Sequence, residues 1–256
     1  MGPIDDWLAQ LDARYRRDLT PPEFLKAVRA LSARYVERRA DLAGRSALDS
    51  PGKRAAFAAF YAPLHFLTVR GIVGALGADA TPIDRLVDLG CGTGAASAAW
   101  ALALPRVPDL VGVDASGWAV GEARWTWRAL GLHGRPRRGD LVQAAERRLR
   151  SSAGSRTALL FAWSVNELGS AARRRLLDAL TADAARSVTV LVIEPLARRA
   201  TPWWDEWTTA LESPALRADE WKLDVTLPPP LARIDRAAGF RRDGLTARTL
   251  WRPARL

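Results

Sequence analysis

The chain has 256 residues, 48% of them hydrophobic, and 38 basic residues against 28 acidic ones give a net charge of +10. This apolar content is ordinary for a globular protein, and the length allows one large domain or one domain with an appendage. A single cysteine, Cys91, excludes an intrachain disulfide and any zinc or iron–sulfur site built from cysteines. The apolar runs are shorter than the roughly 18 residues of a membrane span, and the charged N-terminus lacks a signal-peptide core. We expect a cytoplasmic protein without a membrane or metal site.

The positive charge has two interpretations. Strong basicity is typical of proteins that bind an anionic partner such as RNA. However, only three of the 38 basic residues are lysines, namely Lys26, Lys53 and Lys222. A GC-rich genome produces such an arginine bias without selection for binding. Basicity by itself therefore favours a nucleic-acid partner only modestly.

Residues 1–80 are predicted to form helices. Thr20, Pro21 and Glu23 combine an N-cap threonine, a proline in the first helical position and a glutamate in the third, which is the signature of a capping box. Ser50 and the proline after it begin another helix, which ends near Gly77 and has a wide apolar face. We expect these helices to cap a second domain formed by residues 81–256.

From about residue 83 the pattern changes to short apolar runs that alternate with helical stretches. The runs are RLVDLG, DLVGVDAS, ALLFAWSVNEL and VTVLVIEP, and the break LHGRPRRGD separates two of the helices. This alternation predicts an α/β fold with a mostly parallel sheet, and right-handed crossovers place its carboxyl strand ends at one ligand-binding edge. The segment LARIDRAAGF predicts a final helix, after which we expect two closing strands.

The stretch VDLGCGTGAASAAW joins a predicted strand to a predicted helix through a glycine-rich turn. Gly90, Gly92 and Gly94 allow a sharp turn and a close approach of a ligand to the start of the helix. These glycines suit NAD, FAD and S-adenosylmethionine (SAM) equally well. The choice among these cofactors therefore depends on the residues around the turn.

A carboxylate lies at or near the end of each of three predicted strands. Asp88 precedes the glycine turn, where an anion repels a pyrophosphate but binds the ammonium group of SAM. Asp114 ends the next strand, where an acidic residue holds ribose hydroxyls, and Asp140 follows the third strand, where it can accept a hydrogen bond from adenine. Each residue also has a structural interpretation, since Asp88 can cap a turn and Asp140 can cap a helix. The three together favour SAM over a dinucleotide.

The motifs VDLGCGTG, GVDAS, RGD and AWSVNEL, at their spacings over residues 83–256, resemble those of a class I SAM-dependent methyltransferase. The resemblance implies a Rossmann-like seven-stranded, mostly parallel sheet with helices on both faces and a reversed final hairpin. It assigns Asp88 and Gly90 to the methionine end of SAM, Asp114 to the ribose and Asp140 to the adenine. Further cofactor contacts are expected at Cys91, Gly92, Gly94, Ala115, Leu141 and Trp163.

Methyl transfer is an in-line displacement, so the enzyme must chiefly align the nucleophile and exclude water. Trp163, Asn166 and Glu167 follow the fourth strand and are expected to face the methyl group. Asn166 can orient an amine or amide, and Glu167 can take a proton or hold a cation. The alternatives are that Asn166 and Glu167 cap the next helix and that Trp163 belongs to the core. Tyr61 and His65 are expected to form a lid, although a structural histidine is the competing interpretation.

The acceptor is less clear from the sequence than the cofactor. NEL after the fourth strand, EP after the fifth and the tyrosine-bearing helix are loosely similar to the small-ribosomal-subunit-associated methyltransferase-like family, although that family's cluster-binding cysteines are absent. Trp203, Trp204 and Trp207 either stack on bases or pack together. Our first hypothesis is methylation of ribosomal RNA or a ribosomal component, which requires a basic surface. The second is a small-molecule methyltransferase, which requires a deep closed cleft, and the third is a non-catalytic assembly factor. Oligomeric state is open.

Overall fold

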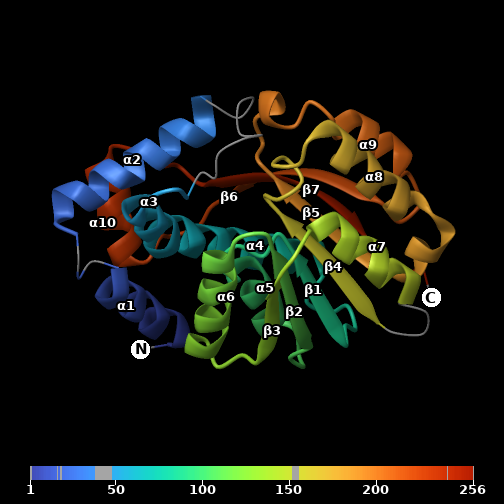
Figure 1. Ribbon diagram of the computed structural model, residues 1–256, viewed down its shortest axis with the longest axis horizontal. Coiled ribbons are helices and arrows are strands. Elements are labelled where there is room, and N and C mark those ends of the chain that lie inside the picture. The colour runs from blue at the N-terminus through green and yellow to red at the C-terminus, as the bar shows by residue number, and fades with distance from the viewer. Residues whose placement is uncertain are drawn as a thin grey trace.

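A computed structural model describes residues 2–15, 17, 19–37, 48–151, 156–240 and 242–255. In these residues a twisted seven-stranded sheet has helices on both faces, and the N-terminal helices lie at one end of the molecule (Figure 1). The strands are β1 (Arg85–Leu89), β2 (Asp109–Asp114), β3 (Gly134–Arg138), β4 (Thr157–Ala162), β5 (Thr189–Glu194), β6 (Arg217–Leu223) and β7 (Leu245–Arg252).

The helices account for most of the remaining described residues. The α-helices are α1 (Pro3–Tyr15), α2 (Pro21–Glu37), α3 (Pro51–Ala56), α4 (Ala62–Leu76), α5 (Ala95–Ala103), α6 (Gly117–Ala129), α7 (Leu141–Ser151), α8 (Ser170–Thr181), α9 (Trp204–Ala210) and α10 (Pro229–Ala238). A π-helical turn, η2 (Phe57–Tyr61), joins α3 to α4, and short 3-10 helices lie at η3 (Asp183–Ser187) and η4 (Arg198–Ala200).

The strand order is β3-β2-β1-β4-β5-β7-β6, in which the first five strands are parallel and β7 runs antiparallel to both of its neighbours. This arrangement confirms the predicted Rossmann-like fold. The carboxyl ends of the parallel strands meet at one edge of the sheet, and β7 begins at the same edge because it runs in the opposite direction. That edge therefore gathers residues from distant parts of the chain.

The closing strands differ from the prediction in one respect. Only β7 follows α10, and its partner β6 precedes that helix. β6 has the sequence RADEWKL, and its residues are alternately exposed and half-buried. An outer strand with one solvated face has no continuous apolar run, so the sequence pattern does not distinguish it from a loop.

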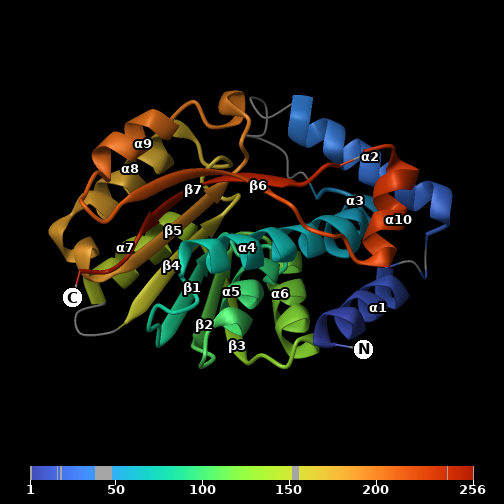
Figure 2. The same cartoon turned by 180° about the vertical axis from the view of Figure 1, so that it is seen from behind.

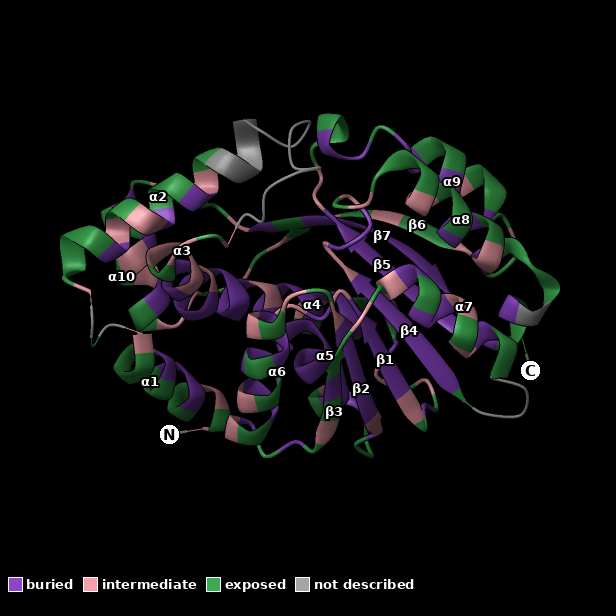
Figure 3. Ribbon diagram, viewed as in Figure 1, coloured by how far each residue is buried: buried purple, intermediate pink, exposed green. Residues whose placement is uncertain are grey.

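Two hydrophobic layers cover the sheet, one on each face. Alternate strand residues such as Leu86 and Leu160 pack with α4 and α5, while their neighbours Val87 and Leu159 pack with α7 and α8. Figure 2 shows α4 lying across one face of the sheet, and Figure 3 shows buried strands between helices whose outer sides are exposed. The parallel strands β1, β2, β4 and β5 are buried on both faces, which is the reason that they read as continuous apolar runs, whereas the edge strand β3 (GRPRR) is mostly exposed.

The helix that runs from Pro51 to Leu76 through the π-turn is central to this core. Among the described residues it alone is long and apolar enough to cross a membrane, but 72% of its most apolar window is buried inside the structure. It begins at Ser50, whose hydroxyl accepts from the backbone N of Lys53, and ends at Gly77, which is left-handed with φ 69°. The apolar faces of this helix therefore pack against the rest of the protein.

The other N-terminal helices are fastened to the sheet domain by packing and polar contacts. The predicted capping box is present, since the carboxylate of Glu23 accepts from the backbone N of Thr20 at 2.8 Å. Arg14 of α1 pairs with the buried carboxylate of Glu122 in α6 at 2.8 Å. Arg29 of α2 donates to the carbonyl of Ala237 at the end of α10 at 2.7 Å. One continuous apolar core joins these helices to the sheet.

Candidate functional site

A cavity of about 860 Å³ lies at the edge where the parallel strands end, between the sheet and the N-terminal helices. Its walls come from the glycine turn, the ends of β2 to β5, the π-turn with α4, and the chain that enters β7. All but one of the predicted site residues line it, namely Tyr61, His65, Asp88, Gly90, Cys91, Gly92, Asp114, Ala115, Asp140, Leu141, Trp163, Asn166 and Glu167.

Gly94 is the exception, and its role is in the packing of the turn. It is the left-handed N-cap residue of α5, with φ 75°, and a Cβ atom there would lie 2.6 Å from Nε1 of Trp127. That indole nitrogen donates to the carbonyl of Gly94 at 3.0 Å. The third glycine is therefore required by the close packing of α6 against the turn.

Gly90 has a similar constraint from the opposite side. Its φ is 82°, and a Cβ atom would lie 2.4 Å from the Cβ of Ser164. Ser164 follows β4 and donates its hydroxyl to the carbonyl of Leu89 at 2.7 Å. The turn after β1 is thus pressed against the end of β4, which leaves the backbone of the turn open to a ligand on the cavity side.

Asp88 is buried at the base of the cavity, with 1% of its surface exposed. Its Oδ2 accepts from the hydroxyl of Ser97 at 2.6 Å, while Oδ1 is buried and accepts no hydrogen bond within the described residues. Burial raises the pKa of this carboxyl to about 7, and the nearby charge of Asp114 adds to the rise. A buried carboxylate oxygen with unused acceptor capacity fits the ammonium group of SAM.

Asp114 and Asp140 already hold backbone groups in place. The carboxylate of Asp114 accepts from the N–H of Gly92 at 2.9 Å and from the N–H of Ser116 at 2.8 Å, which ties the end of β2 to the glycine turn. Asp140 is exposed and accepts from the N–H of Gln143 at 2.8 Å, so it caps α7. The structural interpretation of Asp140 is present, and its position on the cavity wall is compatible with adenine contact as well.

Cys91 is a small residue packed inside the turn. Its side chain is 5% exposed, and burial raises the pKa of the thiol well above its usual value. Sγ would lie 3.0 Å from a Cβ atom at Gly112 in β2. The thiol is therefore held as an uncharged packing group, which makes it a poor nucleophile.

Trp163 follows β4 with a left-handed backbone, φ 55°, an uncommon conformation for a residue other than glycine. Its N–H donates to the carbonyl of Ile193 at 2.7 Å, and its indole stacks on the imidazole of His65 with ring centroids 3.9 Å apart. Phe57 of the π-turn approaches the same imidazole edge-on at 5.8 Å. The strained backbone is thus coupled to an aromatic contact that joins the sheet edge to α4.

The histidine is held in an apolar environment. Burial, together with the smaller effect of the Arg242 charge, lowers the pKa of His65 to about 3. The imidazole is therefore neutral at physiological pH. Tyr61, one turn earlier, presents its ring to the cavity, but its hydroxyl donates to the carbonyl of Val28 in α2 at 3.1 Å. The hydroxyl of Tyr61 therefore connects the π-turn η2 to α2.

Asn166 is positioned by a glutamate that is completely buried. Oε1 of Glu194 accepts from the backbone N–H of Val165 at 2.9 Å and from that of Asn166 at 3.1 Å. Oδ1 of Asn166 is buried and accepts no hydrogen bond within the described residues. α8 begins at Gly169 without a side-chain cap, so Asn166 and Glu167 do not cap it. Glu167 is exposed on the cavity wall.

Several lining residues had no recognisable sequence signal. Phe57 enters through the π-turn, and Arg199 and Arg242 enter from η4 and from the chain before β7. Only the EP dipeptide at the end of β5 marked Glu194 as a residue of this edge, and nothing local indicated that it holds the Asn166 loop. These residues are adjacent because of the sheet order, which brings β7 beside β5.

The three tryptophans after β5 pack together. Trp203, Trp204 and Trp207 are 6%, 7% and 1% exposed, and the rings of Trp203 and Trp207 are 4.8 Å apart. They belong to the hydrophobic core on the face of the sheet that α7 and α8 cover. Packing, and not stacking on bases, is therefore their role.

Comparison with known proteins gives a partial sequence match and several distant structural ones. Residues 75–150 match the family described as Methyltransferase small domain. No curated protein gives a significant match. The SAM-dependent methyltransferase of Agrobacterium tumefaciens is 17% identical with a TM-score of 0.49, over 75% of this chain and 62% of its own, so this chain spans less than two thirds of its length.

Two further solved structures are similarly distant. The SAM-dependent methyltransferase of Archaeoglobus fulgidus is 12% identical with a TM-score of 0.47, over 73% of this chain and 94% of its own. The plantazolicin methyltransferase BpumL, solved with S-adenosylhomocysteine (SAH), is 12% identical with a TM-score of 0.48, over 99% of this chain and all of its own. The family match over residues 75–150, the strand order and the carboxylates around the glycine turn agree with the class I SAM-dependent methyltransferases that the sequence motifs resemble, for which SAM is the expected cofactor.

Proposed function

We propose that the protein methylates a small molecule that enters the cavity, and not the surface of a folded RNA. The observation that carries this proposal is the enclosure of the catalytic edge. The residues expected to face the methyl group, Trp163 and Asn166, lie in a cavity that the π-turn and α4 wall off on one side. An acceptor must therefore be small enough to enter beside the cofactor.

The size of the cavity supports this class of acceptor. Its 860 Å³ must hold the cofactor as well as the acceptor, and it lies within the range of about 300–1,000 Å³ that is typical of small-molecule sites, so the space left beside the cofactor suits a compact acceptor. Aromatic and aliphatic side chains such as Phe57, Leu64 and Leu196 line it, together with a few polar groups. That mixture is typical of pockets that orient one compact ligand.

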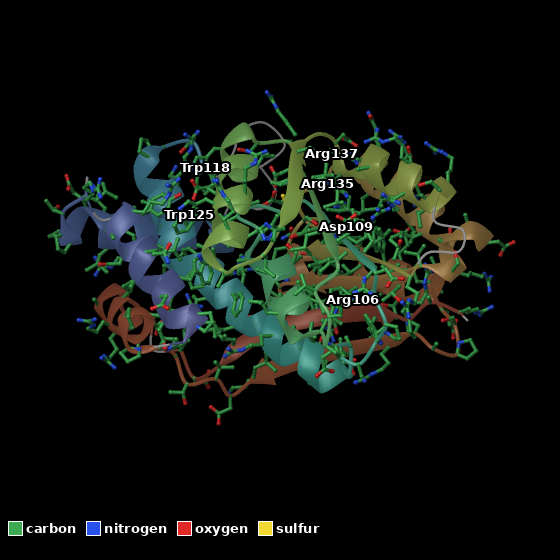
Figure 4. All side chains as sticks on the ribbon, turned by 90° about the horizontal axis from the view of Figure 1, so that it is seen from below. Arg106, Asp109, Trp118, Trp125, Arg135 and Arg137 are labelled. Atoms are coloured by element: carbon green, nitrogen blue, oxygen red, sulfur yellow. The ribbon has the colours of Figure 1, made fainter. Side chains whose placement is uncertain are left out.

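Some of the surface arginines behind the positive charge have acidic partners. Arg135 in β3 pairs with Asp109 in β2 at 2.7 Å, and Figure 4 shows these two side chains together with that of Arg137. In α8, Arg174 pairs with Glu206 and Arg175 pairs with Glu146. Surface pairs of this kind reduce the local field that a phosphate backbone requires. The ribosome-associated branch stays a hypothesis without support from the site.

The protein's own groups provide alignment. Bound SAM supplies a methyl group on a positively charged sulfonium. Oδ1 of Asn166, fixed through the backbone contacts of Glu194, is in place to accept the N–H or O–H of the acceptor and so to direct the lone pair of its nucleophile. We assign Glu194 as the positioning residue, and the stacked rings of His65 and Trp163 exclude water from the same region.

The experiment that tests the proposal uses SAM with a radiolabelled methyl group. Purified protein is added to extract from a strain that lacks the gene, and small subunits, free RNA, protein and small molecules are then separated. We expect label in the small-molecule fraction, and none with Asp114→Ala. Label in ribosomal RNA or ribosomal protein contradicts the proposal and supports the first sequence-based hypothesis. A cellular role that survives Asn166→Ala but requires the N-terminal helices supports a non-catalytic assembly factor.

A further inference from the structure

Most of the charged residues that line the cavity are separated by sign along the sheet edge. Three carboxylates, Asp88, Asp114 and Asp140, lie at the ends of β1, β2 and β3, and a fourth, Glu167, lies in the loop after β4. The two arginines among the described lining residues lie on the other side of β4, since Arg199 follows β5 and Arg242 precedes β7. In the strand order, the Asn166 loop after β4 lies between the two groups.

This separation divides the cavity into two regions. The three carboxylates at the ends of β1 to β3 and the glycine turn form the cofactor region. The arginines belong to the remaining region, where the acceptor must lie if its nucleophile is to reach the Asn166 loop. From this we propose that the acceptor carries a carboxylate group, which Arg242 binds. This inference rests on the proposed function and names the chemical class of its substrate.

Arg242 is fixed by its surroundings. Its Nε donates to Oδ1 of Asp235 at 2.7 Å, and its backbone N–H donates to Oδ2 of the same carboxylate at 3.3 Å. Asp235 is 4% exposed and lies in α10. The guanidinium carbon lies 4.8 Å from the ring centroid of Phe240 and 5.7 Å from that of Phe60. Arg242 is exposed, but its guanidinium is held by these contacts and so loses little conformational freedom when a ligand binds.

The contact with Asp235 does not use the whole guanidinium. Within the described residues, the hydrogen bonds of the Arg242 side chain involve only Nε. The two Nη atoms provide four further N–H donors, and a planar pair of donors matches the two oxygens of a carboxylate. Arg242 lines the same cavity as His65 and Tyr61.

Arg199 supports the same assignment from the opposite wall. It lies in η4, is exposed, and forms no ion pair within the described residues. A second cation on the cavity wall attracts an anionic acceptor, although Arg199 lacks the contacts that fix Arg242. Arg242 is therefore the residue on which the test depends.

The test compares two probes of equal size, phenylacetate and its neutral amide phenylacetamide, on protein saturated with SAH. Their ring suits the aromatic wall, and they differ only in the group offered to the arginine. By calorimetry or ligand-observed NMR we expect phenylacetate to bind about tenfold more tightly, since a charge-assisted bidentate contact is at stake. Arg242→Gln should reduce the ratio to about one, with the affinity for SAH unchanged.

Matched variants separate this contact from general effects. Arg236→Gln removes an exposed charge from α10, the helix that carries Asp235, and should keep the tenfold preference. The double variant Asp235→Asn/Arg242→Gln replaces the ion pair by two amides, so that the loop retains a polar pair if the single variant unfolds.

Three results overturn the inference. They are equal or absent binding of the two probes by the native protein, an unchanged preference in the folded Arg242 variants, and a loss of SAH affinity in those variants, which would mean that the arginine serves the cofactor. Failure of the native protein to bind SAH contradicts the proposed function instead, so the two failures are distinguishable.

Discussion

His65 of α4 stacks on Trp163 at the end of β4, with ring centroids 3.9 Å apart and ring planes inclined by 14°. This contact links α4 to the sheet edge at which the cavity lies. It also buries an imidazole where protonation is unfavourable, and that property is measurable.

The first prediction concerns acid stability. The pKa of His65 is lowered to about 3 in the folded protein, so below pH 6.5 the unfolded chain binds a proton that the folded chain does not. The free energy of unfolding should therefore fall as the pH drops from 6.5 towards 3, by about 2 kcal/mol at pH 5. His65→Phe keeps an aromatic ring and should lack this part of the decline. Urea titrations at pH 7 and pH 5 measure it, with the exposed His133→Gln as the control. An equal decline in His65→Phe would contradict the assignment.

The second prediction is a conflict between stability and cofactor binding at Asp88. Its pKa is raised to about 7, so the folded protein loses stability as the pH rises from about 4 through 7. Asp88→Asn should be more stable than the native protein at pH 8, by roughly 1–3 kcal/mol, and the two should converge at pH 4. The same variant should lose SAH affinity because the ammonium loses its carboxylate. Thermal melts and calorimetry test both parts, with the exposed Asp178→Asn as a control for charge. A stable variant with native SAH affinity would exclude Asp88 from the cofactor site.

The third prediction tests the packing of the glycine turn. A Cβ atom at Gly90 would lie 2.4 Å from the Cβ of Ser164, and the backbone has φ 82°. Gly90→Ala should reduce the free energy of unfolding by about 2 kcal/mol or more. Gly121→Ala in α6 is the control, because a Cβ atom there meets nothing within 4 Å, and it should stabilise by roughly 0.5–1 kcal/mol. Similar results for the two variants would show that the turn is not tightly packed.

The fourth prediction concerns Glu194 as a positioning residue. Glu194→Ala leaves the N–H groups of Val165 and Asn166 without their buried acceptor and should cost about 2 kcal/mol or more. Glu194→Gln retains a carbonyl oxygen for both bonds and should cost clearly less. With the acceptor found by radiolabelling, Glu194→Ala should lower kcat while Glu194→Gln largely restores it, and both should bind SAH like the native protein. A glutamine variant as inactive as the alanine variant would argue for a role of the charge itself.

The sequence by itself predicted the order of strands and helices from β1 to β5 and which residues gather in the cofactor half of the candidate site. Most of the parallel strands read as apolar runs, and the glycines and carboxylates expected to contact SAM lie within a few residues of those strand ends, so local pattern was sufficient to bring Asp88, Gly90 and Asp114 together on the cavity wall.

Only the tertiary structure decided the acceptor half. The placement of β6, the π-turn that brings Phe57 to the cavity, the contact of Glu194 with the Asn166 loop and the position of Arg242 all depend on elements distant in the chain. The tertiary structure also decided between alternative roles of single residues. Burial shows that the three tryptophans after β5 pack in the core, and the hydroxyl of Tyr61 donates to the carbonyl of Val28. The physical reason is that periodicity reports which face of an element is buried, whereas only the fold determines which other elements that face meets.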